Sequence, residues 1–284
     1  MLIRKYQGKI LLGLLVITIV VWIFVFQEST PNKFLEINFL DVGQGDAIFI
    51  ESLNKQQMLI DGGPDASILE KLGRVMNFYD HYIDIVLLTH PEQDHINGLI
   101  EVLKRYNVGE IVFTGTIRDT AQYQEFINLI KNKNIPIKIA YQGEKIDFGD
   151  GINLNILYPF ENLKNQKLSD NNNSSIVSKL VYKNFELLLT GDIEKSVENK
   201  LIKEKVNLTA DVIKIAHHGS KTSTSEAFLK AVNAIMAVIE VGKDNKYGHP
   251  HQEVLDRLKN LIVLQTGIEG NIQLLTDGER IIKK

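Results

Sequence analysis

Residues 85–99 read IVLLTHPEQDHINGL, and the rest of the chain is best interpreted from this stretch. Its apolar start, Ile85–Leu88, predicts a buried β-strand, because both faces of such a strand would be apolar. Thr89 and Pro91 mark the end of this run, and polar residues follow at once. A polar cluster is therefore expected at the C-terminal end of a buried strand.

This cluster holds two imidazoles and two carboxylates within six residues, namely His90, Glu92, Asp94 and His95. Pro91 prevents a continuous helix, so these side chains can converge on one point in a compact turn. Imidazole and carboxylate groups suit Zn, Mn or Fe, and the lack of thiols argues against a purely structural zinc site. A helix N-terminus capped by Asp94, with solvated histidines, is the simpler alternative, but it accounts poorly for so dense a cluster.

The cluster resembles the first metal motif, His-x-His-x-Asp-His, of the metallo-β-lactamase superfamily, with Glu92 in place of the second His. A harder oxygen donor there shifts the metal preference from Zn towards Mn or Mg. Within the superfamily, segments across Leu35–Leu275 resemble, in order, the extracytoplasmic ComEC-type hydrolase domains of DNA-uptake proteins. The resemblance implies an α/β fold, the four-layer αβ/βα sandwich, and a hydrolase that uses two divalent metal ions, Zn or Mn.

The composition is that of an ordinary globular protein: 284 residues, 44% apolar and 24% charged, which allows a sizeable core. There is no cysteine, so disulfides and thiolate metal sites are excluded. Residues 1–33 hold four basic residues and one acidic residue, which leaves 28 basic and 34 acidic residues and a formal charge of −6 in the remainder. This acidic balance disfavours tight non-specific binding of nucleic acid, although it allows a nuclease whose metals carry the positive charge.

The N-terminus differs from the rest of the chain. Three basic residues lie within the first nine, and an uncharged run follows over residues 10–26, which is long enough to cross a tilted or thinned bilayer. No small-x-small cleavage site follows, so residues 1–27 predict an uncleaved transmembrane signal-anchor rather than a removed signal peptide. The positive flank stays inside, so a linker at 28–34 and a hydrolase domain at 35–284 are expected outside the cytoplasm, on a single-pass protein of the cell membrane.

Two early strand ends carry acids and glycines. A strand at Leu35–Leu40 leads through a Gly-rich turn to a strand at Ala47–Glu51, and a hairpin alone would explain the glycines. The segment FLDVGQGDA also resembles the opening motif of the ComEC-type domains, which implies that Gln44 and Asp46 support the metal ligands or face the substrate. The next strand ends in Asp61, which is either an Asx turn or, by the same resemblance, another supporting carboxylate.

Elsewhere, hydrophobic periodicity predicts alternating strands and helices in two halves. Helices are expected over residues 66–77, 96–106, 121–132, 194–204, 225–232 and 252–258. Strands are expected over residues 57–60, 110–114, 135–140, 146–148, 152–157, 176–182, 185–189, 212–216, 234–240, 262–266 and 271–276. His81 lies outside every cluster and is expected to be at the surface or structural.

A long polar segment, Asn162–Ser175, has the composition of a flexible loop. Its end, with Asn172, Asn173 and Ser175, resembles the Asn-Asn-x-Ser motif of the ComEC-type domains. Amide and hydroxyl groups are poor zinc ligands, so these three side chains are expected to hydrogen-bond bound water or phosphate rather than coordinate strongly.

Two further strand ends offer metal ligands. Asp192 follows the strand at 185–189, where it either caps the next helix or, as the resemblance implies, bridges two cations about 4 Å apart. His217 and His218 follow the strand at 212–216, which is apolar but for Lys214. Adjacent residues of an extended chain point to opposite sides, so one histidine is expected to bind metal. His217 is favoured, with His218 as a support or phosphate contact.

The last cluster is a loop over residues 241–251, which resembles the Gly-Lys-x-Asn-x-Tyr-Gly-His-Pro segment of the ComEC-type domains. By this resemblance Lys243 supplies charge to a phosphate oxygen and His249 protonates a leaving group. In isolation both residues would be interpreted as loop surface. Six of the seven histidines of the chain fall in the three strand-end clusters, and such a concentration is hard to explain by structure alone.

The sequence thus predicts a metal-dependent hydrolase whose activated water attacks a phosphorus or carbonyl centre. The expected metal ligands are His90, Glu92, Asp94, His95, Asp192 and His217, and the expected catalytic residues are Asp94, His249 and Lys243. The resemblance favours phosphodiester bonds, DNA in particular, as substrate. The alternatives are a phosphodiesterase acting on cell-wall or lipid head groups and a non-catalytic extracellular binding module that a metal stabilises. The oligomeric state is left open.

Overall fold

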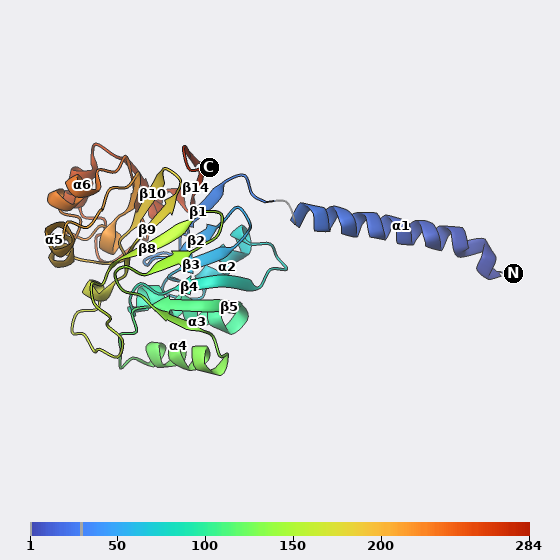
Figure 1. Cartoon of the computed structure of the whole chain (residues 1–284), viewed down its shortest axis with the longest axis horizontal. Coiled ribbons are helices and arrows are strands. Elements are labelled where there is room, and N and C mark those ends of the chain that lie inside the picture. The colour runs from blue at the N-terminus through green and yellow to red at the C-terminus, as the bar shows by residue number, and fades with distance from the viewer. Residues whose placement is uncertain (1, 29–30) are drawn as a thin grey trace.

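The computed structural model describes the backbone of residues 2–28 and 31–284 and the side chains of residues 6–22 and 31–284. Part of the predicted linker and the side chains of Arg4 and Lys5 lie outside this range. A single long helix, α1 (Leu2–Glu28), points away from the folded body (Figure 1). Among the described residues, no helix has both the length and the apolar character that a membrane span requires, and the predicted transmembrane helix is unsupported to that extent.

Two mixed sheets form the body. The first has the strand order β15-β14-β1-β2-β3-β4-β5-β6. Its strands are β1 (Leu35–Phe39), β2 (Ile48–Glu51), β3 (Gln57–Ile60), β4 (Tyr82–Leu87), β5 (Asn107–Phe113), β6 (Ile137–Ile139), β14 (Ile272–Thr276) and β15 (Ile281–Lys283). The second has the order β13-β12-β11-β10-β9-β8-β7. Its strands are β7 (Lys145–Asp147), β8 (Asn153–Tyr158), β9 (Val177–Tyr182), β10 (Phe185–Leu189), β11 (Val212–Lys214), β12 (Met236–Ile239) and β13 (Ile262–Gln265).

Helices cover the outer face of each sheet, which gives four layers (Figure 1). On the first sheet lie α2 (Ser67–Val75), α3 (Gln93–Arg105) and α4 (Ala121–Asn132). On the second lie α5 (Lys195–Lys203), α6 (Glu226–Val232) and α7 (Gln252–Leu258), while α8 (Thr266–Glu269) is a single turn after β13. The helices pack through one apolar stripe: in α3 the buried residues include Ile96, Leu99, Ile100 and Leu103, at helical spacing.

The main core lies between the two sheets. Phe39 of β1 and Leu187 of β10 are both fully buried in one cluster that draws on both sheets. Each such side chain contributes about 1.5–3 kcal/mol relative to exposure. Further clusters fill the space beneath the helices on either side, so both faces of each sheet are apolar. The four-layer sandwich expected from the sequence is therefore observed.

Strand direction positions the functional residues. Strands β3 to β6 run parallel to one another, and so do β10 to β13. The turns after β3, β4, β10 and β11 carry Asp61, residues 90–95, Asp192 and residues 217–218. Polar side chains thus follow the carboxyl ends of parallel strands, where α/β proteins place their sites.

Most expected elements are confirmed to within a few residues, with two departures. Strand β11 ends at Lys214, and Ala216–Gly219 form the short turn η2 instead of a continuing strand. In η2, His217 and His218 have φ angles of 51° and 53°, so the extended backbone assumed for this pair is wrong. Helix α8 and strand β15 were not predicted.

Candidate metal centre

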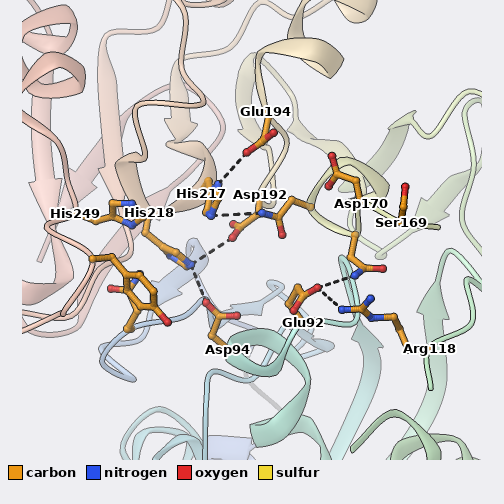
Figure 2. A pocket seen from close by; sticks show the side chains of 14 residues that line it. Glu92, Asp94, Arg118, Ser169, Asp170, Asp192, Glu194, His217, His218 and His249 are labelled. Carbon is orange, nitrogen blue, oxygen red and sulfur yellow. Dashed lines mark hydrogen bonds and ion pairs between the residues drawn. The ribbon is translucent and has the colours of Figure 1, made fainter. Parts of the chain in front are cut away.

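Four side chains from three segments converge at one point. They are Asp94 and His95 in the first turn of α3, Asp192 after β10 and His218 in η2, and their ligand atoms lie within 4.8 Å of one another. His95 Nε2 lies 3.3 Å from Asp192 Oδ2. His218 Nε2 lies 3.4 Å from Asp192 Oδ2 and 3.2 Å from Asp94 Oδ2 (Figure 2). Asp94 Oδ1 lies 3.9 Å from His95 Nε2, so both carboxylates contact both imidazoles, and Asp192 is the buried one of the two.

This group fits a divalent cation. His95 Nε2 and Asp192 Oδ1 are buried and have no hydrogen-bond partner among the described residues. Leaving such atoms unpaired costs about 1–3 kcal/mol each, a cost that a bound ion would remove. Two imidazoles and two carboxylates form a donor set that Zn or Mn accepts.

Hydrogen bonds on the far side of each ring hold the two imidazoles in place. His95 Nδ1 lies 2.8 Å from Asp61 Oδ2, and Asp61 also accepts hydrogen bonds from the backbone N–H and the hydroxyl of Thr89. His218 Nδ1 lies 2.8 Å from the backbone oxygen of Glu240. These contacts direct both Nε2 atoms at the cluster, as partners of metal-binding histidines commonly do. The supporting role expected of Asp61 fits this geometry.

Strong electrostatic coupling links the four residues. Burial alone would lower the pKa of His95, but Asp192, Asp61 and Asp94 raise it well above its usual value. Asp192 and Asp46 do the same for His218. Burial tends to raise the pKa of Asp192, yet the two histidines hold it well below its usual range. Because a metal requires neutral imidazoles, its binding must displace protons from this group.

A buried lysine that sequence reasoning missed supports the same group. Lys214 is 1% exposed; its Nζ pairs with Asp46 and lies 3.6 Å from Asp192 Oδ1. Burial would lower its pKa, but these two carboxylates raise it. The signal was present, because Lys214 is the one charged residue in an otherwise apolar strand. Asp46 also lies 3.3 Å from His218 Nδ1, which agrees with its expected supporting role.

A second acidic group does not offer a comparable site. Asp46, Asp61 and His95 also have ligand atoms within 4.8 Å of one another. However, Lys214 pairs with Asp46, and Thr89 donates to Asp61. Asp46 Oδ2 and Asp61 Oδ2 are therefore already engaged, and of the carboxylate oxygens in this group only Asp46 Oδ1 lacks a hydrogen-bond partner among the described residues. The group is better interpreted as a support for the first.

Glu92, an expected ligand, is engaged elsewhere. Its Oε1 accepts hydrogen bonds from Arg118 Nη2 at 2.6 Å and from Asn171 Nδ2 at 2.7 Å (Figure 2). The structure therefore does not bring Glu92 into the four-residue group, because a cation and an amide from other segments satisfy its carboxylate. Nothing in the local sequence around Arg118 or Asn171 indicated either contact.

His90, the other expected ligand of the first motif, is buried beside the group. Its ring centroid lies 4.1 Å from that of His95, and its Nδ1 lies 3.0 Å from the Thr89 hydroxyl. Burial and then His95 lower its pKa to about 3, so the ring is neutral. Its Nε2 has no hydrogen-bond partner among the described residues and remains free to act as a ligand.

The expected preference for His217 over His218 is reversed by the geometry. His218 is 1% exposed and reaches Asp94 and Asp192. His217 is turned to the pocket, with Nε2 3.4 Å from Asn172 Nδ2 and Nδ1 3.9 Å from Glu194 Oε1. The physical reason is the left-handed backbone of both residues, which removes the alternation of an extended chain.

The group opens into a polar pocket of about 550 Å³. Its wall includes Gln44, Asn172, His217 and His249. Burial, followed by the neighbouring histidines, lowers the pKa of His249 to about 4, so at neutral pH this ring does not hold the proton that its expected role as a proton donor requires. Lys243 is exposed and does not line the pocket, so the structure does not bring it to the site.

Asn173 and Ser175 of the Asn-rich motif accept hydrogen bonds from the backbone. Ser175 Oγ accepts a hydrogen bond from the N–H of Asp192 at 3.1 Å, and Asn173 Oδ1 accepts one from Glu194 N–H at 3.0 Å. Both therefore fix the turn that carries Asp192. Of this motif, Asn172 alone lines the pocket.

Comparison with known proteins agrees with this geometry. Residues 40–234 match the family model described as the metallo-beta-lactamase superfamily. Over 95% of its length the chain is 28% identical to ComE operon protein 3 of Bacillus subtilis, and over 87% it is 28% identical to Competence protein ComA of Neisseria gonorrhoeae. The chain spans only about a third of each, 36% and 33%.

Solved structures share the fold. The metallo-beta-lactamase fold protein YhfI of Bacillus subtilis matches with a TM-score of 0.53 at 12% identity, covering 88% of this chain and all of that one. Such low identity indicates the architecture alone. The family match, in contrast, covers more than half of the chain. The chain therefore belongs to the metallo-beta-lactamase superfamily, and its relatives are ComEC-type competence proteins.

Proposed function

We propose that this metal-dependent hydrolase of the metallo-beta-lactamase superfamily is a phosphodiesterase that cleaves DNA outside the cytoplasm. The observation that carries the proposal is the group of Asp94, His95, Asp192 and His218 at the base of an open polar pocket. DNA is favoured among the possible phosphodiesters by the names of two relatives, Competence protein ComA and Recombination protein 2 of Haemophilus influenzae, which is 28% identical over 89% of this chain. Since the chain spans only about a third of these proteins, their whole function is not transferred to it.

The four residues would hold one cation, and His90, with its free Nε2, is the residue on which a second position would be built. We keep two divalent ions, Zn or Mn, as part of the proposal. When bound, a divalent cation supplies the Lewis acidity that makes water a nucleophile near neutral pH.

Asp94 is the member of the group that faces solvent. Its side chain is 34% exposed, whereas those of His95, His218 and Asp192 are 0–3% exposed. Burial tends to raise the pKa of Asp94, but His95 and His218 lower it, so the carboxylate stays ionised. It can therefore accept a hydrogen bond from a water molecule and orient it towards a substrate in the pocket. His217 and the neutral His249 can contact that substrate from the pocket wall.

The test is hydrolysis of bis(p-nitrophenyl) phosphate and of single- and double-stranded DNA by the full chain, with Mn²⁺ or Zn²⁺ added. We expect metal-dependent cleavage that EDTA abolishes and that Asp94→Ala loses. Glu101→Ala, which lies on the same helix and pairs with Lys104, is the matched control and should retain activity.

The other outcomes assign different functions. Turnover of bis(p-nitrophenyl) phosphate without cleavage of DNA would indicate that the substrate is a cell-wall or lipid head-group diester. If EDTA lowers the melting temperature but no phosphodiester or ester is hydrolysed under any metal, the chain is a metal-stabilised binding module.

Attachment to the cell membrane through residues 1–27 is part of the proposal. Residues 10–26 contain no charge, and large apolar side chains of α1 such as Leu11 and Trp22 are 66% and 63% exposed. Apolar surface of this extent is favourable to bury in lipid. Fractionation of expressing cells tests it: the full chain should stay with membranes after an alkaline wash, and release into the supernatant would contradict attachment.

A further inference from the structure

The pocket is poor in positive charge for a site that takes an anionic substrate. Its wall carries five carboxylates, on Glu92, Asp94, Asp170, Asp192 and Glu194. Among the described lining residues, Arg118 is the one lysine or arginine. The domain outside the N-terminal region is acidic as well, so no general positive field compensates. Arg118 is therefore the residue whose charge a phosphate in this pocket would meet.

Arg118 is held in place by Glu92, but most of its hydrogen-bond donors are unused. One hydrogen bond joins its Nη2 to Glu92 Oε1, and that same oxygen also accepts from Asn171 Nδ2. A guanidinium has five N–H donors, and no other of them has a hydrogen-bond partner among the described residues. Its Nε is buried, whereas the side chain as a whole is 26% exposed, so a phosphate would approach the Nη end of the guanidinium.

Arg118 lies away from the metal centre. In Figure 2, Glu92 lies between Asp94 and Arg118, so the guanidinium is on the far side of Glu92 from Asp94. A phosphate bound to Arg118 is therefore a different group from the one whose bond is cleaved. A substrate that uses both positions must carry at least two phosphates.

The shape of the site allows such a substrate. A second hollow of about 530 Å³ adjoins the first and shares Gln44, Glu92, Asp94 and Tyr247 with it. Asp94 and Glu92 line both hollows, and Lys246 lines the second. The site thus has room for groups beyond a single phosphodiester.

We propose that Arg118, positioned by Glu92, binds a phosphate next to the one that is cleaved, so the substrate is a strand with successive phosphates, such as single-stranded nucleic acid. This inference rests on the proposed phosphodiesterase function, whose site it extends. It also gives Glu92 a role. This acid, which replaces the second His of the metal motif, holds the anion-binding Arg118 in position.

Binding, rather than hydrolysis, provides the test. The probe is a fluorescein-labelled thymidine octamer with phosphorothioate linkages, which keep the charge and resist cleavage. Its affinity for the full chain is measured by fluorescence anisotropy over a range of NaCl concentrations, with Mn²⁺ present throughout. Loss of one phosphate contact on a single strand reduces the slope of log affinity against log salt by about 0.7.

We expect Arg118→Met to show that loss of slope together with roughly tenfold weaker binding at low salt. Arg118→Lys, which keeps the charge, should retain the slope. Arg74→Met removes an arginine that pairs with Glu70 on an exposed helix face, and it should match the wild-type chain. Circular dichroism confirms that each variant is folded.

Three results would overturn the inference: no binding by the wild-type chain, equal slopes for wild type and Arg118→Met, or an equal loss in Arg74→Met. Hydrolysis of bis(p-nitrophenyl) phosphate by the wild-type chain is measured in parallel. That compound has a single phosphate, so its failure to react would contradict the proposed function without bearing on the salt slope.

Discussion

Glu92 and Asp94 are two carboxylates only two residues apart at the start of α3, yet they face opposite walls of one pocket (Figure 2). Asp94 lies 3.2 Å from His218 and belongs to the metal-binding group. Glu92 lies 2.6 Å from Arg118 and is neutralised there. Residue type and place in a motif are similar for both. The partner that the fold brings to each decides its role.

The two walls also differ in burial. His95, Asp192 and His218 are 0–2% exposed, so charges there interact through a medium of low polarity. The side chains of Glu92 and Arg118 are 32% and 26% exposed, and solvent screens their pair. Substitutions on the buried wall should therefore have much larger effects than those on the open wall.

Asp192→Asn should have the largest effect, because it removes the charge of the buried carboxylate that contacts both imidazoles while keeping the side-chain shape. Loss of a supporting partner weakens metal binding about 10–100-fold, so loss of a ligand should weaken it by more than the upper end of that range, about 100-fold. Metal stoichiometry measured by mass spectrometry, and hydrolysis in the same samples, check this. Asp119→Asn, an exposed acid paired with Lys167, is the control. A full equivalent of bound metal in Asp192→Asn would show that Asp192 is not a metal ligand.

Lys214→Met tests the buried cation of the same wall. Breaking a buried ion pair leaves Asp46 and Asp192 uncompensated, which should lower the free energy of unfolding by about 3–5 kcal/mol. Urea denaturation in the presence of EDTA measures the protein without metal. Lys104→Met on the exposed face of α3 should change little. Equal stability of Lys214→Met and wild type would show that the lysine is not part of the support.

Asp61→Asn should have an intermediate effect. The amide keeps a hydrogen bond to Thr89 but no longer holds His95 through a charged partner, so metal affinity should fall about 10–100-fold. A competition titration against a metal-binding dye gives the affinity. Asp65→Asn, which changes a solvent-exposed acid of the neighbouring segment, serves as the reference variant. An unchanged affinity would mean that Asp61 does not orient the imidazole.

Glu92→Gln should have the smallest effect on metal affinity, because Arg118 and Asn171 engage its carboxylate. The loss should be smaller than the about tenfold that removal of a supporting residue costs at least. The same dye titration measures it. A loss close to that of Asp192→Asn would make Glu92 a ligand after all, as the motif alone predicts, and the contrast between the two walls would disappear.

Much of this architecture could be predicted from local sequence. Apolar runs such as Ile85–Leu88 and Phe185–Leu189 mark strands buried on both faces, and acids or histidines directly after them indicated Asp94, His95 and Asp192. The strand predictions succeed because strand burial and the polar turn that follows are properties of adjacent residues. Lys214 could also have been found, since a charge in a buried strand requires a partner.

The rest depends on contacts between distant segments. Arg118 and Asn171 approach Glu92 from positions 26 and 79 residues away, which no local pattern encodes. The choice between His217 and His218 depended on the backbone conformation of η2, where two non-glycine residues take positive φ angles. Such a conformation is determined by the surrounding fold rather than by propensity.

The pairing of β1 with β14 joins the two ends of the domain. Leu35 lies opposite Thr276, and among the described residues β2 is the one other strand that pairs with β1. During synthesis, one edge of β1 therefore stays unpaired until residues 272–276 have been made. An open strand edge is a template for aggregation. A ribosome-bound or truncated chain that ends before residue 272 retains that edge, so loss of a short C-terminal segment acts on the N-terminal strand of the sheet.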